Sequence, residues 1–466
     1  MSVRDLFKPV DMTEGDPVKK IVAFSIPMLI GNIAQQLYNT VDSIIVGRFV
    51  GDNALAAVGG AGPILNLMLV LFIGISVGAS IMVSQYFGAR AREELSRTIG
   101  ACVVMTIVAS IMIMIVGPLI SGPLLRLLNT PESILGWCIQ YLNIIFIGIL
   151  GGGLYNILSG VLRGLGDSVS ALIYLLVATV LNIIGDYVFV VYFSMGVAGV
   201  ALATVLAQIV SAVLCVRKLM KMSDVFDMNR EMLRPQKKYV QQLIRLGLPS
   251  GVTQAIFSMS MIVVQSLTNS FGELFIAANV IVMRIDGFVM MPAFSFGSAM
   301  TTFAGQNIGA GKMERVAEGT KRGTLVAMAT SAVLTVLILL FGRHLMAIFT
   351  STDALIEVSY HNMQILSAGY IAMEVTQCLS GVMRGAGDTV TPMWISILNS
   401  VIIRVPLAYI LVGLTRTPEL PQGNFYMMPT SLLITWLIGA CITFAGRKST
   451  RLNSSHPTTS RMPSSA

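Results

Sequence analysis

Long apolar runs, separated by short polar and charged segments, recur along the whole chain of 466 residues. A run of about 20 apolar residues is long enough to cross a bilayer as an α-helix. The pattern therefore predicts twelve transmembrane helices. Their expected ranges are Ile21–Gly47, Leu55–Phe87, Ile99–Ile120, Gly136–Leu162, Val169–Tyr192, Val197–Leu219, Val240–Phe271, Leu274–Ile308, Gly323–Phe349, Leu355–Met383, Val390–Leu414 and Phe425–Ala445.

The composition supports an all-α polytopic membrane protein. Charged residues make up 12% of the chain and hydrophobic residues 55%, whereas about 25% of a soluble domain is charged. With a cytoplasmic N-terminus, the inner segments hold 21 Lys and Arg, and the outer loops hold four, Arg48, Arg126, Arg343 and Arg416. Cytoplasmic loops collect basic residues, so this asymmetry predicts a multi-pass protein of the bacterial cytoplasmic membrane. The +8 net charge then needs no nucleic-acid partner.

The two halves of the sequence repeat at an offset of 221 residues. Gly51 matches Gly272, and SGVLRGLGDSV at 159–169 matches SGVMRGAGDTV at 380–390. An even number of helices in each half predicts two parallel six-helix repeats, an N-lobe and a C-lobe, around a central cavity. The expected division is 1–20 for the cytoplasmic N-terminus, 21–220 for the N-terminal lobe, 221–239 for a cytoplasmic linker and 240–446 for the C-terminal lobe.

The repeated RGxGD turn has two interpretations. Arg163 and Arg384 stand at expected helix C-termini, where a cation suits the helix dipole. A following glycine can adopt the left-handed conformation, and Asp167 or Asp388 can cap the next helix. In the other interpretation the turns form a gating contact between the two halves.

Some features carry no catalytic or metal-binding signal. The five cysteines lie within or beside apolar runs without a CxxC pair, so we interpret them as helix-packing residues. The three histidines form no cluster, and the polar N-terminus does not look like a signal peptide. Residues 447–466 resemble the translation of a sequencing-library adapter, which predicts a non-native tail and a truncated last helix. A genuine disordered tail is the alternative.

A few polar residues within the apolar runs are candidates for a coupling site. A carboxylate at the centre of a bilayer costs about 2.5–3.5 kcal/mol on insertion scales. Counting 1.5 Å per residue places Asp42, Asn182, Asp186 and Thr204 at similar depths in the outer half of the N-terminal lobe. Their oxygens suit Na⁺, and two neighbouring carboxylates can also share a proton. Alternatively, each polar residue makes an ordinary hydrogen bond between helices.

The chain resembles the multidrug and toxic compound extrusion (MATE) family of bacterial cation-coupled efflux transporters from about Val18 to Ala445. The resemblance rests on IPMLIGNIAQQLYNTVDSIIVG in the first helix, on the RGxGD turns and on RVPLAYIL at 404–411. It implies a Na⁺ or H⁺ site, bulky organic cations as substrates, and a bend at Pro27 that either moves with ion binding or is a static kink. The site would consist of Asp42, Asn182, Asp186, Thr204 and the backbone carbonyl of Val200.

The C-terminal lobe is not equivalent, because Val263 occupies the position that matches Asp42. Its membrane helices nevertheless contain charged residues, Arg284, Asp286, Glu374 and Arg404. We consider Tyr38, Gln35, Asp286, Glu374 and Arg404 as candidates for substrate binding or coupling. Alternatively, the C-terminal residues form internal pairs of arginine and acid that stabilise the bundle.

Together these observations predict a secondary active antiporter that exports organic cations in exchange for H⁺ or Na⁺ by alternating access of its two lobes. A lipid-linked precursor flippase of the same superfamily is the alternative function. We expect no enzymatic activity and no cofactor beyond the coupling ion. The expected partners are small organic cations and the lipid bilayer, and the expected state is a monomer.

Overall fold

Contacts between Cα atoms divide the chain into two compact units. The computed structural model describes residues 9–227, 229 and 231–454, with side chains up to 446. Of these residues, unit 1 contains 9–11 and Ile26–Gly251, and unit 2 contains Met12–Ser25 and 252–454. The described residues leave out parts of the predicted N-terminal segment and tail. They also leave out three of the 21 basic residues expected on the cytoplasmic side, Arg4, Lys8 and Arg230.

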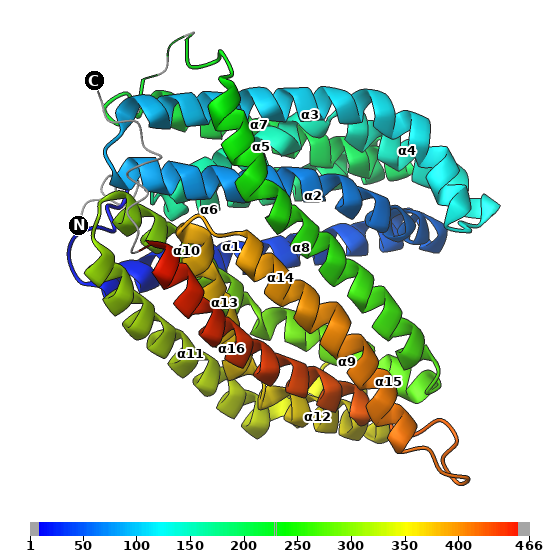
Figure 1. The fold of residues 1–466 in the computed structure, drawn as a ribbon. Helices are drawn as coiled ribbons and strands as arrows, with labels where there is room; N and C mark the ends of the chain where they lie inside the picture. Colours follow the sequence, from blue (N-terminus) through cyan, green and yellow to red (C-terminus); the bar gives the residue numbers. More distant parts are fainter. Residues whose placement is uncertain (1–8, 228, 230, 455–466) are drawn as a thin grey trace. The chain divides into compact units, whose positions relative to one another are not determined.

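Helices form both units. Helix α1 (Pro17–Phe49) passes from unit 2 to unit 1 at Ser25, and α8 (Lys237–Asn269) passes from unit 1 to unit 2 at Gly251. In unit 1, α2 and α3 lie side by side (Figure 1). The remaining elements of unit 1 are α2 (Asp52–Gly88), α3 (Arg92–Leu127), α4 (Glu132–Ile147), α5 (Ile149–Gly164), α6 (Ser168–Asp186), the π-helix η2 (Tyr187–Tyr192) and α7 (Gly196–Met220).

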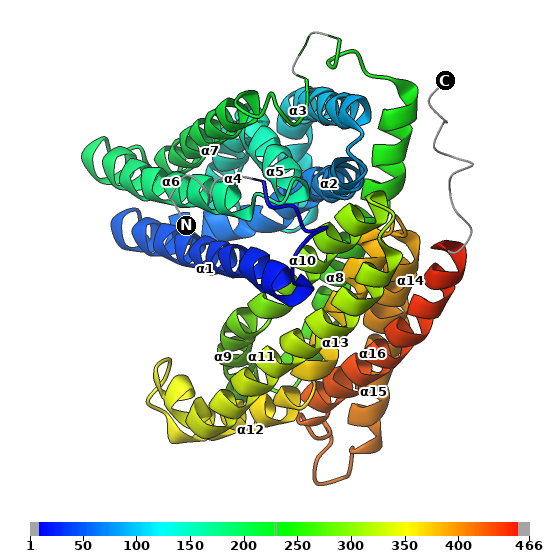
Figure 2. The same ribbon diagram turned by 90° about the vertical axis from the view of Figure 1, so that its left-hand side faces the viewer.

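Unit 2 is built around α13, which packs against α10, α11 and α16 (Figure 2). The elements of unit 2 besides its parts of α1 and α8 are α9 (Glu273–Val289), α10 (Met291–Gly309), α11 (Met313–Ala347), α12 (Asp353–Ser367), α13 (Tyr370–Gly385), α14 (Val390–Ile397), the π-helix η3 (Leu398–Ile403), α15 (Arg404–Leu414) and α16 (Met427–Ser454).

The all-α membrane fold that the sequence predicts is confirmed. Among the described residues, ten helical stretches are long and apolar enough to cross a membrane, and two bent pairs raise the number to twelve if each pair is one span. The predicted helices at 136–162 and 355–383 are not continuous, because α4 and α5 meet at 56° and α12 and α13 at 47°. The first bend lies at Gly148, where a Cβ atom would fall 2.2 Å from Val205.

The RGxGD turns form the helix caps that their sequence predicts. Gly166 and Gly387 both adopt φ of +85°, in the region that favours glycine. The Ser170 N–H donates to Asp167 Oδ1 at the start of α6, and the Thr391 N–H donates to Asp388 Oδ1 beside α14, each over 2.9 Å. Asp167 also pairs with Lys218 at 3.2 Å. Capping therefore accounts for the spacing of both turns.

Glycines let α2 and the first part of α8 approach each other closely within unit 1. A Cβ atom at Gly74 would lie 2.9 Å from the Gly247 carbonyl oxygen, and one at Gly247 would lie 2.5 Å from the Gly74 carbonyl oxygen. Gly78 makes a similar approach to Leu243. Small residues at helix crossings are typical of membrane bundles, where close backbone packing supplies much of the association energy.

The segment after α7 is fastened to the start of α3. Arg92 donates to both carboxylate oxygens of Asp227 over 3.0 and 2.7 Å and to the carbonyl oxygens of Ser223 and Asp224. The Asp227 N–H donates to Ser96 Oγ over 2.8 Å. The hydrogen bonds from Arg92 hold the pKa of the Asp227 carboxyl below its usual value.

We expect acid to loosen this segment. A carboxyl whose pKa is lowered by folding stabilises the docked form above its unfolded pKa, and this stabilisation is lost as the pH falls through the lowered pKa. At neutral pH, Asp227→Asn should speed trypsin cleavage at Lys221 and Arg234. Asp224→Asn is the matched control, because Arg92 contacts only the backbone carbonyl of Asp224. Equal cleavage rates in the two variants would contradict this account.

The structure shows the burial of the cysteines and the end of the last helix. All five cysteines are free; Cys102, Cys138, Cys215 and Cys378 are buried, as helix packing predicts, whereas Cys441 is exposed. Helix α16 continues past residue 446 to Ser454.

Candidate functional site

The polar residues predicted for the N-terminal lobe come together where α1, α6 and α7 meet in unit 1. Gly185 allows this approach, because a Cβ atom there would lie only 3.0 Å from the Cβ of Ala203 on α7. Asp186, Asn182 and Ala203 are at most 2% exposed, so the acidic side chain of α6 points into the unit. Figure 2 shows α1 beside α6, and Gly31 of α1 faces Leu172 and Leu175 of α6.

Two carboxyl groups form the centre of this cluster. Asp42 of α1 and Asp186 of α6 lie within hydrogen-bonding distance of each other. The Oδ1 atom of each is buried, with no hydrogen-bond donor among the described residues. Among the described residues, no salt bridge involves either aspartate. Two carboxylates this close repel each other unless a proton or a cation lies between them.

A chain of neutral polar groups leads away from the acidic pair. The Asn182 amide, oriented to satisfy its neighbours, donates to Asp186 Oδ2 over 3.0 Å and accepts from Thr204 Oγ1 over 3.2 Å. Thr204 Oγ1 is then free to accept from the Tyr38 hydroxyl, 3.4 Å away. The four predicted side chains of the N-terminal site and Tyr38 are therefore connected through α1, α6 and α7.

The structure adds one residue that sequence reasoning missed. Tyr141 of α4 is 6% exposed and lies close enough to interact electrostatically with Asp42, Asp186 and Tyr38. Its only signal in the sequence is a tyrosine within a short polar interruption, QYLN, of an apolar run. We therefore add Tyr141 to the cluster as a buried neighbour of the acidic pair.

Three further N-terminal candidates lie on α1 and α7. Val200 is buried one turn before Thr204 on α7. Gln35 is exposed and donates to Asn39 of its own helix over 3.5 Å, so this hydrogen bond does not reach the acidic pair. Helix α1 runs unbroken through Pro27.

The C-terminal candidates do not form one cluster. Asp286 of α9 interacts with Tyr370 of α13 and, electrostatically, with Arg404 of α15. Glu374 is 2% exposed, and its Oε1 atom has no hydrogen-bond donor among the described residues. The alternative of internal arginine–acid pairs finds no support at Arg284, which is exposed on α9 and forms no salt bridge among the described residues. The reason is geometric, because Arg284 lies two residues before Asp286 and so points to a different face of α9.

These residues do not make a high-affinity transition-metal site. Within the described part of the chain, no group of three or more His, Cys, Asp or Glu side chains could hold a metal ion. The N-terminal cluster offers only oxygen ligands from two carboxyls, an amide and a hydroxyl. Such a donor set is suited to a proton or to a hard cation that is bound reversibly.

Comparisons with known proteins agree with this architecture. One family model, MatE, matches the chain twice, at residues 27–188 and 249–410, which confirms the two repeats. "Probable multidrug resistance protein YoeA" of Bacillus subtilis is 30% identical over 89% of this chain and 91% of its own length. "Multidrug export protein MepA" of Staphylococcus aureus is 23% identical over 86% and 90%.

Solved structures show the same fold. A multidrug resistance MATE family transporter of the MOP superfamily, solved in an outward-facing conformation, superposes with a TM-score of 0.88 at 24% identity. The match covers 96% of this chain and 98% of that one. A MOP superfamily transporter from Pyrococcus furiosus, whose binding pocket is described as having reverse polarity, gives a TM-score of 0.87 over 96% and 98%.

Proposed function

Since the chain belongs to the MatE family, we propose that it exports small organic cations across the cytoplasmic membrane of a bacterium in exchange for H⁺ or Na⁺. The curated relatives carry the names of multidrug resistance and export proteins. The excess of Lys and Arg in the segments expected to be cytoplasmic supports an N-terminus inside the cell. Nothing in this mechanism needs more than one copy of the chain.

The acidic pair of Asp42 and Asp186 carries the proposal. A transporter needs a site that holds an ion tightly enough to select it and releases it in each cycle. The pair meets the first condition because both Oδ1 atoms are buried and lack donors, so a bound H⁺ or Na⁺ compensates charge that would otherwise repel. It meets the second because no described salt bridge neutralises the pair permanently.

Competition between the coupling ion and the organic cation for the acidic pair explains how one is exchanged for the other. When an ion occupies the two carboxyls, an organic cation gains little from them; when the ion leaves, the negative charge favours the organic cation. Mutually exclusive binding, combined with alternating access, couples the two movements. Each positive charge that enters down a membrane potential of about 100 mV releases about 2.3 kcal/mol. That energy can maintain an outward gradient of substrate.

We also propose Pro27 as a hinge. Proline removes one hydrogen bond from the helix and so lowers the cost of bending. The change of unit along α1 falls between Ser25 and Ile26, beside Pro27, and along α8 between Gly251 and Val252, close to Pro249. In this proposal, occupation of the acidic pair changes the conformation of α1 around Pro27.

Efflux from vesicles tests the proposed function. Purified protein is reconstituted into vesicles loaded with ethidium, and a Na⁺ gradient and then a pH gradient are imposed. We expect at least one gradient to drive ethidium movement, and collapse of that gradient to stop it. Asp52→Asn serves as the control, because Asp52 is an exposed aspartate at the start of α2. Ethidium movement that ignores both gradients would rule out the antiporter.

A further inference from the structure

A cavity within unit 2 is separate from the acidic pair. It has a volume of about 560 Å³ and lies between α8, α9, α12, α15 and α16. Its lining includes Met261, Gln265, Asn279, Asp286, Asn362 and Arg404. Cavities of this size hold drug-sized molecules, and a few well-placed polar groups usually fix how the molecule is oriented.

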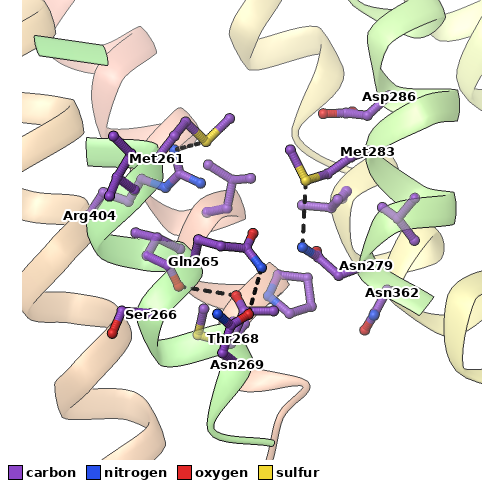
Figure 3. Close-up of a pocket in the computed structure, with 17 residues that line it drawn as sticks. Met261, Gln265, Ser266, Thr268, Asn269, Asn279, Met283, Asp286, Asn362 and Arg404 are labelled. Carbon is purple, nitrogen blue, oxygen red and sulfur yellow. Dashed lines mark hydrogen bonds between the residues drawn. The ribbon is translucent and has the colours of Figure 1, made fainter. Parts of the chain in front are cut away.

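One wall of the cavity presents hydrogen-bond acceptors. Asp286 of α9 and Asn362 of α12 lie on the same side in Figure 3. The Oδ1 atom of each is buried, and no described residue donates a hydrogen bond to it. Asn362 is only 2% exposed. A buried acceptor without a donor costs about 1–3 kcal/mol, so this wall favours a ligand group that carries N–H donors and positive charge.

The opposite wall presents donors. Arg404 is 7% exposed and lies beside Met261, across the cavity from Asp286 (Figure 3). Nη1 of Arg404 donates a hydrogen bond to Met261 Sδ over 3.5 Å, although a guanidinium has five N–H donors and a thioether is a weak acceptor. Arg404 and Asp286 interact electrostatically, but no direct salt bridge joins them among the described residues. A carboxylate would suit Arg404 far better than Met261 does, because it can accept two charge-assisted hydrogen bonds from the guanidinium.

We propose that this cavity is a substrate subsite for dipolar organic molecules that carry a cationic amine at one end and a carboxylate at the other. The amine faces Asp286 and Asn362, and the acceptor group faces Arg404. The thioethers of Met261 and Met283 cover the apolar middle of the ligand, since flexible Met side chains adapt to different shapes. The inference deepens the proposed function and rests on it for the view that the ligand is cargo.

Two dyes that differ at one group test the subsite. Rhodamine 110 carries a carboxylate beside its cationic ring system, and rhodamine 123 is its methyl ester. Their affinities for the purified protein are measured by fluorescence anisotropy. We expect rhodamine 110 to bind about tenfold more tightly, as a charge-assisted hydrogen bond would give. Equal affinities, or tighter binding of the ester, would overturn the proposal.

Two variants and a control distinguish the contributions of the two walls to dye binding. Arg404→Met should weaken rhodamine 110 by about tenfold without weakening the ester, and so remove the preference. Asp286→Asn, which keeps the shape of the side chain, should weaken both dyes alike. Arg284→Met is the matched control, because Arg284 is exposed on α9 and does not line the cavity. Retention of the preference for rhodamine 110 in Arg404→Met would also overturn the proposal.

A measurement on the unaltered protein covers the case in which a variant does not fold. Rhodamine 110 bound in the cavity should slow oxidation of Met261 and Met283 by hydrogen peroxide, as followed by mass spectrometry. Met259, which is 66% exposed on α8 and does not line the cavity, should oxidise at the same rate with and without dye. Unchanged oxidation of Met261 and Met283 would contradict the subsite. Neither assay uses an ion gradient, so failure of the antiporter proposal would be seen separately.

Discussion

Asp42→Asn should reduce gradient-driven ethidium efflux by at least about tenfold, within the range typical of coupling between two ligands. The substitution leaves one carboxylate, Asp186, with an amide beside it in place of the second acid. The site then carries one negative charge fewer, and it no longer needs a proton or cation to relieve repulsion between two carboxylates. Asparagine has nearly the shape of aspartate, so the packing of α1 should survive.

The control for this prediction is the same substitution at an exposed aspartate. Asp52→Asn removes the same charge from an exposed position at the start of α2 and should leave efflux unchanged. Equal surface expression of both variants shows that the effect is on transport. Full activity in Asp42→Asn would contradict the role assigned to the acidic pair, whatever the activity of the control.

Gly74→Leu should destabilise the protein by about 1–3 kcal/mol, the usual cost of overpacking a tight contact. The added Cβ atom would lie 2.9 Å from the Gly247 carbonyl oxygen and 3.6 Å from the Cα of Gly251. Backbone atoms cannot turn aside as a flexible side chain can, so α2 and α8 must separate. The melting temperature of detergent-purified protein measures the effect.

A glycine on the same helix provides the control for packing. A Cβ atom at Gly59 of α2 would meet nothing within 4 Å. Gly59→Leu should therefore leave the melting temperature unchanged or raise it slightly, because leucine favours helix by nearly 1 kcal/mol relative to glycine. If both leucine variants melt at the same temperature as the original protein, close packing at Gly74 does not stabilise the unit.

The sequence predicted the N-terminal cluster because helix geometry leaves little freedom there. The rise per residue is fixed, so Asp42, Asp186 and Thr204 could be placed by depth from the ends of their helices. The four-residue spacing of Asn182 and Asp186 put them on one face. The RGxGD caps followed from local chemistry in the same way, as the Asp167 and Asp388 hydrogen bonds show.

The direction in which a side chain points from its helix was harder to predict than its depth along the helix. Arg284 and Tyr141 lie in helices with long apolar stretches, and no pattern in the sequence says which neighbour each one faces. Arg284 is exposed, and Tyr141 is buried close enough to the acidic pair to interact with it electrostatically. The bend at Gly148 was missed for a related reason, because glycines are common in straight membrane helices. Only the approach of Val205 shows why α4 ends there.

The C-terminal cavity forms where side chains from several helices meet, which the sequence of any one helix does not show. Its polar lining residues Asn279, Asn362 and Arg404 come from α9, α12 and α15. In the sequence, Asn279 and Arg404 each look like an isolated polar residue, and Asn362 is one of several polar residues in the stretch SYHNMQ at 359–364. Arg404 follows directly after the π-helix η3, as Asp186 directly precedes η2. π-Helical turns shift the direction of the residues beside them and occur often at functional sites.

Ion release on substrate binding tests the central claim most directly. Purified protein in weakly buffered solution is mixed with excess ethidium, while a pH indicator and a Na⁺-sensitive dye report the ions set free. If ions and organic cations compete for Asp42 and Asp186, ethidium binding should release H⁺ or Na⁺ from the original protein and little or none from Asp42→Asn. Ethidium binding without ion release, or equal release from both proteins, would contradict the account.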